Sequence, residues 1–235
     1  MGWVKRAGLV LIASGLVHLV LLVAGDGPWT GPVSWRKPAT FGVSFGLTLL
    51  IVAWLVPALP LPERWRRVLL GVFAVDCYVE VGGVTLQAWR HVPSHLNRET
   101  AFDSGVSTVL AAGGFVLVVV LGVMCVAAWR ARVPPSMRLA LRAGFGSLAI
   151  GLLSGAAMVA RGAAAVAQGE QLRAYAVIGF LKPLHGVSLH GVLVLPGLAW
   201  LLSRTSWPES RRTRVVAAAA AGYAVAIGIA AVSGS

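Results

Sequence analysis

The stretch SGVSTVLAAGGFVLVVVLGVMCVAAW, residues 104–129, contains no charged side chain and is long enough to cross the hydrocarbon core of a bilayer. Such a run is typical of a transmembrane helix. The rest of the chain has the same character, since 57% of its residues are hydrophobic and only 12% are charged, with a mean hydropathy of +0.81. Soluble domains carry roughly 25% charged residues. The sequence therefore predicts an all-α integral membrane protein.

Six further segments are comparably long and apolar. The expected spans cover residues 7–25, 39–59, 68–89, 104–129, 139–160, 179–202 and 214–232. The first run follows two basic residues, as in a signal peptide, but it is about 19 residues long and lacks a small-residue cleavage motif. We expect it to be a retained helix. The prediction is one polytopic bundle of seven helices, a single transmembrane domain over residues 1–235, in the cell (inner) membrane.

The distribution of basic residues predicts the orientation of this bundle. With the N-terminus inside, 13 of the 20 Lys and Arg residues fall on the inner side and 7 on the outer side. The C-terminus is then outside. The net charge of +12 is accounted for by this asymmetry and by attraction to anionic membrane lipids, so it does not indicate nucleic-acid binding. Cys77 and Cys125 lie inside apolar runs and are expected to be buried thiols.

Polar residues concentrate toward the outer side in this arrangement. Asp76, Glu80, Gly83, Gln87 and His91 are spaced 4, 3, 4 and 4 residues apart, which places them on one face of a helix. Ionisable groups at membrane depth face a bundle interior, a cavity or a partner. The stripe is therefore either a structural hydrogen-bond network or one wall of a pocket open to the outer face. The expected pocket residues are Gln87, Arg90, Asn97, Asp103, Arg36, Lys37 and Lys182.

All five histidines are expected in the outer half, and four of them are candidate metal ligands: His18, His95, His185 and His190. The pair in HGVSLH is five residues apart, which separates the rings by about 140° on an ideal α-helix. One ion could bind both only at a π-bulge or a locally unwound turn. Otherwise each ring serves a different neighbour.

The segment QAWRHVPSHLN, residues 87–97, is expected to end the third helix and close the outer mouth of the pocket. Pro93 disfavours further helix. The turn should then bring His95 and Asn97 back over the bundle, where Asp103 could accept a hydrogen bond that fixes the tautomer of His95.

The stretches SWRKPATFGVSFG, EVGGVTLQAWRHVPSHLN and HGVSLHGVLVLP resemble a family of bacterial seven-helix membrane proteins to which no activity is assigned. The matching residues are Trp35, Lys37, Pro38, Glu80, Gln87, Arg90, Ser94, His95, Asn97, His185 and His190. The chain departs from the pattern at His91, where a small residue is expected, so the resemblance implies that His95 matters more than His91. The resemblance implies a functional site at these positions without naming its chemistry.

Four functional hypotheses follow. In the first, the protein is a transition-metal-dependent membrane enzyme with zinc favoured, Glu80 and Asp76 as catalytic carboxylates, and a lipid or amphiphilic substrate. In the second, it binds b-type haem for electron transfer. The third is a proton-linked transporter or sensor in which Glu80 and the histidines titrate. The fourth is a purely structural subunit.

Overall fold

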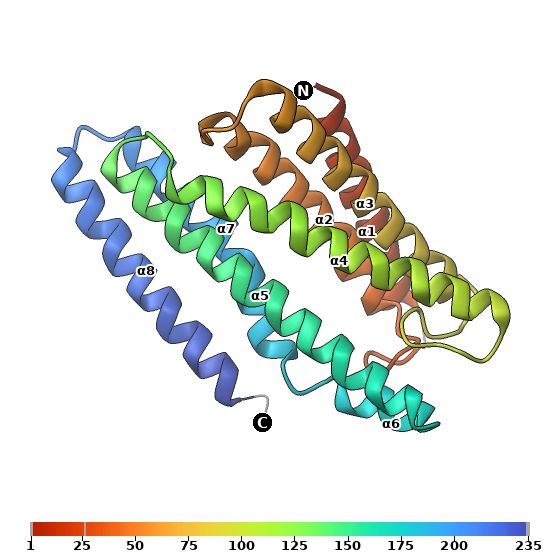
Figure 1. The fold of residues 1–235 in the computed structure, drawn as a ribbon. Coiled ribbons are helices and arrows are strands. Elements are labelled where there is room, and N and C mark those ends of the chain that lie inside the picture. The colour runs from red at the N-terminus through yellow and green to blue at the C-terminus, as the bar shows by residue number, and fades with distance from the viewer. Residues whose placement is uncertain (1, 26, 234–235) are drawn as a thin grey trace. The chain divides into compact units, whose positions relative to one another are not determined.

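The structure, a computed structural model, describes residues 2–25 and 27–233 and consists of helices joined by short loops (Figure 1). In this part of the chain, seven helices are long and apolar enough to cross a membrane, which confirms the predicted number. The helices are α1 (Gly2–Ala24), α2 (Arg36–Leu55), the 3₁₀ turn η1 (Val56–Ala58), α3 (Glu63–Trp89), α4 (Ala101–Trp129), α5 (Pro135–Ala167), α6 (Gln171–Val177), α7 (Lys182–Ser203) and α8 (Glu209–Val232).

The chain forms two compact units. Residues 1–54, 67–117 and 159–178 form unit 1, and residues 55–66, 118–158 and 179–235 form unit 2. Helices α3, α4 and α5 contribute residues to both units.

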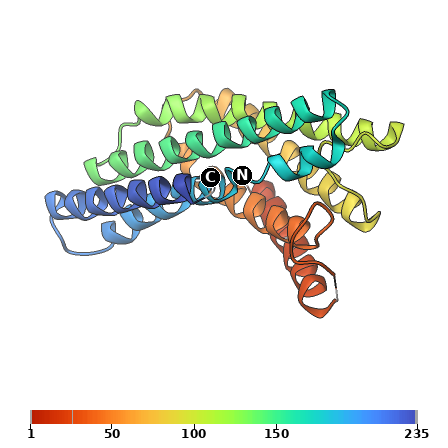
Figure 2. The ribbon, with the colours of Figure 1, turned by 90° about the horizontal axis from the view of Figure 1, so that it is seen from below.

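In unit 1, α1 and α2 pack with their backbones in contact at glycines, and they lie side by side in both views (Figures 1 and 2). A Cβ atom at Gly42 would lie 2.6 Å from the Cα atom of Gly15. One turn further along, a Cβ atom at Gly46 would lie 2.6 Å from the carbonyl oxygen of Gly8. Small residues allow this approach, which drives helix association where lipid removes the hydrophobic effect between helices.

Helix α2 begins where its sequence provides a cap. The hydroxyl of Ser34 accepts a hydrogen bond from the backbone N–H of Arg36 at 3.2 Å. Pro38 occupies the first turn, where a missing N–H costs nothing. This start fixes the position of Lys37, whose side chain belongs to the site described below.

In unit 2, the helices α5, α7 and α8 share an apolar core made of Ala140, Leu195, Ala199, Leu202 and Val216. The hydroxyl of Tyr223 on α8 donates to the carbonyl of Val187 on α7 at 2.6 Å. The carboxylate of Glu209 accepts from the backbone N–H of Ser136 at 2.8 Å and so caps α5.

The helix bounds differ from the expected spans mainly at polar ends. Helix α5 runs to Ala167 rather than residue 160, and α3 begins at Glu63 rather than residue 68. A span estimate counts only apolar residues, whereas backbone hydrogen bonding continues through charged turns at the ends. The short helix α6 was not predicted, because its sequence QLRAYAV is too short and too polar to resemble a span.

Candidate functional site: ionisable groups between helices α2, α3 and α4

One face of α3 carries the polar stripe expected from the spacing, and this face contacts α4. Asp76, Glu80 and Gln87 are all buried. Gly83 lies under the side chain of Leu110, since a Cβ atom at Gly83 would be 2.7 Å from Leu110 Cδ2. The predicted stripe is therefore confirmed from Asp76 to Gln87.

His91 does not continue the stripe, because α3 ends at Trp89 and His91 is exposed beyond it. Its φ angle of 55° is in the left-handed region. The backbone N–H groups of His91 and Val92 donate to the carbonyls of Ala88 and Gln87, at 3.0 and 3.1 Å. This is a left-handed helix end, a position that favours glycine. The left-handed φ angle gives a backbone reason for the small residue that the resemblance implies at position 91.

The loop after this turn places His95 between a cation and a carboxylate. The Lys37 ammonium donates to the hydroxyl of Ser94 at 2.6 Å and lies 3.2 Å from His95 Nδ1. On the other side of the ring, His95 Nε2 lies 3.8 Å from Glu80 Oε2. The loop thus folds back over the helices, as predicted, and connects α2 to the middle of α3.

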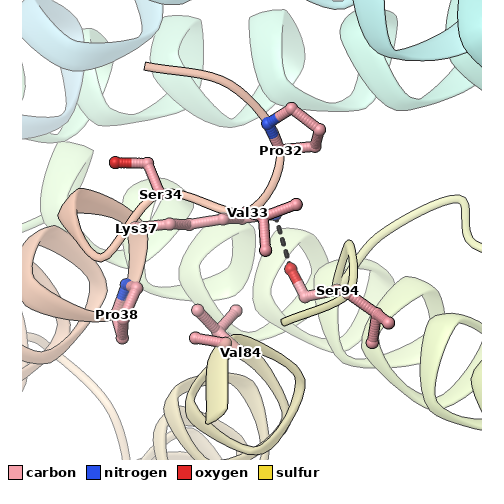
Figure 3. Close-up of a pocket in the computed structure, with 9 residues that line it drawn as sticks. Pro32, Val33, Ser34, Lys37, Pro38, Val84 and Ser94 are labelled. Atoms are coloured by element: carbon pink, nitrogen blue, oxygen red, sulfur yellow. Dashed lines mark hydrogen bonds between the residues drawn. The ribbon is translucent and has the colours of Figure 1, made fainter. Parts of the chain in front are cut away.

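Lys37 and Ser94 both line a narrow crevice that leaves no room for a water molecule (Figure 3). The dashed line in Figure 3 marks their hydrogen bond, and Val84 of α3 lies beneath it. The remaining lining includes Pro32, Val33, Ser34 and Pro38. The Lys37 amine is therefore enclosed by the loop that precedes α2 and by the loop that follows α3.

These contacts define the protonation state of His95. An ammonium group can only donate hydrogen bonds, so Nδ1 is the acceptor and the proton of the neutral ring is on Nε2. Burial, reinforced by the positive charge of Lys37, lowers the pKa of His95 well below its usual range. The neutral ring thus directs its N–H toward the Glu80 carboxylate.

The lowered pKa of His95 predicts that the stability contributed by this residue is lost in acid. The unfolded chain binds a proton at His95 below about pH 6.5, whereas the folded chain binds it only at lower pH. The free energy of unfolding should therefore fall as pH drops below 6.5, by up to about 1.4 kcal/mol per pH unit from this group. Between about pH 7.5 and pH 5, the thermal unfolding midpoint should fall less steeply for His95→Gln than for the natural chain.

His91→Gln is the matched control, because His91 is exposed and outside this contact chain. It should keep the pH dependence of the natural protein. An unchanged acid dependence in His95→Gln would contradict the assignment of a neutral His95.

Deeper in the interface, Glu80 and Asp76 approach the same point on α4. A Cβ atom at Gly113 would lie 2.6 Å from Glu80 Oε1 and 2.9 Å from Asp76 Oδ1. The absence of a side chain at Gly113 therefore makes room for both carboxyl groups. The sequence alone did not indicate that this AAGG segment, residues 111–114, faces the two acidic residues.

At the C-terminal end of α3, Asp103 organises a separate polar cluster. Its carboxylate accepts from Gln87 at 2.8 Å, from the hydroxyl of Thr100 at 2.6 Å and from Arg90. The predicted role of Asp103 as the partner of His95 is wrong, because Asp103 is engaged by these three donors and the carboxylate facing His95 is that of Glu80. The Thr100 hydroxyl caps α4 by accepting from the backbone N–H of Asp103, and it donates to the Asp103 carboxylate that the sequence analysis assigned to His95.

Asn97 is fully buried and fixes the loop to α4. Its backbone N–H donates to the hydroxyl of Ser107 at 3.0 Å, and that hydroxyl in turn donates to the carbonyl of Asn97 at 3.1 Å. The side-chain oxygen of Asn97 accepts from the N–H of Glu99 at 3.0 Å. Asn97 thus shapes the loop that presents His95.

His18 is buried in unit 1 with both ring nitrogens hydrogen-bonded. Nδ1 donates to the carbonyl of Ser14 at 2.7 Å, and Nε2 accepts from the indole N–H of Trp89 at 3.1 Å. The ring also stacks on Trp35, with 5.9 Å between centroids. This arrangement joins α1 to the ends of α2 and α3 and leaves His18 no free nitrogen lone pair.

The remaining candidates are divided between the two units. Arg36 is an exposed residue of unit 1, and Lys182 is an exposed residue of unit 2. His185 and His190 lie on a regular stretch of α7 with no bulge. His185 donates from Nδ1 to the carbonyl of Gly151 on α5 at 2.7 Å, whereas His190 is exposed and bonds its own helix at Gly186. Each ring therefore serves a different neighbour.

Residues 2–25 and 27–233 contain no group of three His, Cys, Asp or Glu side chains arranged to hold a metal ion. The hydrogen bonds of His18 occupy both of its ring nitrogens, whereas those of His185 involve only Nδ1. The metal-enzyme and haem hypotheses, with their proposed substrates, stay predictions.

Comparison of the chain with protein-family models, curated proteins and solved structures gives no match. The resemblance to the seven-helix family therefore stays a prediction.

Proposed function

We propose that this protein is a proton-linked membrane transporter in which Glu80 takes up a proton through His95. The observation that carries the proposal is the position of the His95 ring between the Lys37 ammonium and the Glu80 carboxylate. Ionisable side chains inside transmembrane helices commonly mark ion pathways and proton relays. In this chain they form a continuous row from the loop to the interior of α3.

The contacts support a defined transfer. His95 gives its Nε2 proton to Glu80 Oε2, and Nδ1 accepts a proton from Lys37, directly or through the Ser94 hydroxyl. Glu80 is then neutral, His95 is the other neutral tautomer, and the Lys37 amine regains a proton from water. The gap of 3.8 Å between Nε2 and Oε2 must close by about 1 Å for the proton to move. A small side-chain motion of His95 is therefore required before each proton transfer to Glu80.

The proposal predicts that Glu80→Gln removes proton uptake while the protein still folds. Glutamine keeps the shape of the side chain but cannot accept the proton, so proton entry into liposomes under an imposed membrane potential should fall at least about tenfold. Infrared difference spectra between neutral and mildly acid buffer should show a protonated carboxyl band in the natural protein that is absent from Glu80→Gln.

Glu99→Gln is the matched control, since Glu99 is an exposed acidic residue of the same loop region. It should retain both signals. Liposomes that contain the natural protein but take up protons no faster than empty ones would refute the proposal. Equal uptake in the natural protein and Glu80→Gln would also refute it.

A further inference from the structure

We infer that Asp76, Glu80 and the space at Gly113 form a binding site for a small monovalent cation of the size of Na⁺, which competes with the proton. This inference deepens the proposed function by naming the ion exchanged at the same carboxylate. Its geometry is independent of His95, because it concerns the opposite oxygen of Glu80.

A buried carboxylate oxygen that has no hydrogen-bond partner and faces Gly113 provides the first support. Glu80 and Asp76 are 3% and 6% exposed, and among the described residues Glu80 Oε1 and Asp76 Oδ2 have no hydrogen-bond partner. The unpartnered Oε1 atom is the one that faces Gly113. Buried charged groups that are not hydrogen-bonded are normally paired with a charge or coordinate a metal ion.

The glycine on α4 provides the second support. A methyl group at position 113 would lie 2.6 Å from Glu80 Oε1 and 2.9 Å from Asp76 Oδ1, so both oxygens face the same point on α4 and lie at most 5.5 Å (2.6 + 2.9) apart. A methyl group at the neighbouring Gly114 would have no atom within 4 Å, which shows that the crowding is specific to position 113.

Charge balance selects a monovalent ion. The two carboxylates carry two negative charges, the Lys37 ammonium supplies one positive charge, and His95 is neutral. The other titratable group beside the pair is the buried thiol of Cys77 on α3, which is uncharged in its ordinary state. The group therefore has one unbalanced negative charge. One Na⁺ or one proton neutralises it, and the two should exclude each other.

The first test is thermal unfolding of the purified full-length protein in mildly alkaline buffer, with NaCl compared against choline chloride at equal ionic strength. Na⁺ should raise the unfolding midpoint in a saturable manner, because a ligand that binds only the folded state stabilises it. Lowering the pH by one unit should raise the half-saturating Na⁺ concentration by up to about tenfold, as expected for competition with one proton. Radioactive sodium should bind with the same dependence.

Gly113→Ala and Gly114→Ala form a matched pair of variants. Gly113→Ala should lose Na⁺ binding, and Gly114→Ala should retain it. Asp76→Asn, which preserves the volume of the side chain, should lose Na⁺ binding even if Gly113→Ala fails to fold. Equal midpoints in NaCl and choline chloride would overturn the inference, as would Na⁺ binding that survives in Asp76→Asn.

The outcome is separable from that of the proton relay. The carboxyl band assigned to Glu80 is measured in choline buffer without Na⁺. If that band appears and depends on Glu80 while Na⁺ has no effect, the relay stands and the cation site is wrong. If Na⁺ binds but no proton enters liposomes, the site stands and the transport proposal is wrong.

Discussion

Replacing Gly42 with alanine is expected to lower the thermal unfolding midpoint of the purified protein by about 10 °C. The added methyl group would lie 2.6 Å from the backbone of Gly15, and backbone atoms cannot move aside as a flexible side chain can. Helices α1 and α2 must therefore separate along the whole crossing and lose contacts on both sides. The midpoint is measured by tryptophan fluorescence in detergent.

Gly71→Ala is the matched control, because a Cβ atom at Gly71 would have no neighbour within 4 Å. Its midpoint should stay within about 2 °C of that of the natural protein. The double variant Gly15→Ala with Gly42→Ala should lose less than the two single losses combined, since both methyl groups separate the same crossing. Strict additivity of the two losses would mean that the glycines do not share one contact.

Removing the carboxylate of Asp103 is expected to have a comparable effect, again on the order of 10 °C for Asp103→Ala. The change leaves the amide of Gln87, which is fully buried, and the Arg90 guanidinium without their shared acceptor. It also removes the partner of Thr100 at the start of α4. Limited proteolysis should then cut the loop 90–100 faster, because the anchor at one end of that loop is lost.

The double variant Asp103→Ala with Arg90→Met tests how much of the lost stability comes from leaving the Arg90 guanidinium without its partner. Removing both members of an ion pair avoids the stranded guanidinium, so part of the lost stability should return. If the double variant is less stable than Asp103→Ala, the Arg90 guanidinium does not depend on Asp103, and the cluster holds the loop in another way.

The helical architecture could be predicted from the sequence because the bilayer interior offers the backbone no hydrogen-bond partners. A chain in hydrocarbon must satisfy its backbone within each helix, so apolar length alone marks the seven long helices. The stripe from Asp76 to Gln87 followed from helical periodicity, which is a local property. Helix α6 escaped the same reasoning because neither rule applies to a short polar helix.

The partners of the stripe could not be predicted, since they depend on the register between helices far apart in sequence. Nothing local indicates that Glu80 should face His95 while Asp103 faces Gln87. This pairing arises because the Thr100 hydroxyl, which caps α4, also donates to the Asp103 carboxylate. The backbone N–H of Asn97, in turn, fixes the loop to the Ser107 hydroxyl. The role of Gly113 was hidden for the same reason, because a glycine in an apolar helix has no chemistry until its neighbour is known.

The contact between Gly113 and the two carboxyl groups also restricts the order in which these positions can change during evolution. A larger residue at position 113 meets the Glu80 and Asp76 oxygens as long as both are present. The acidic side chains must shorten or disappear first, after which the glycine becomes free to vary. Positions 76, 80 and 113 therefore behave as one mutational unit, although more than thirty residues of chain separate the first from the last.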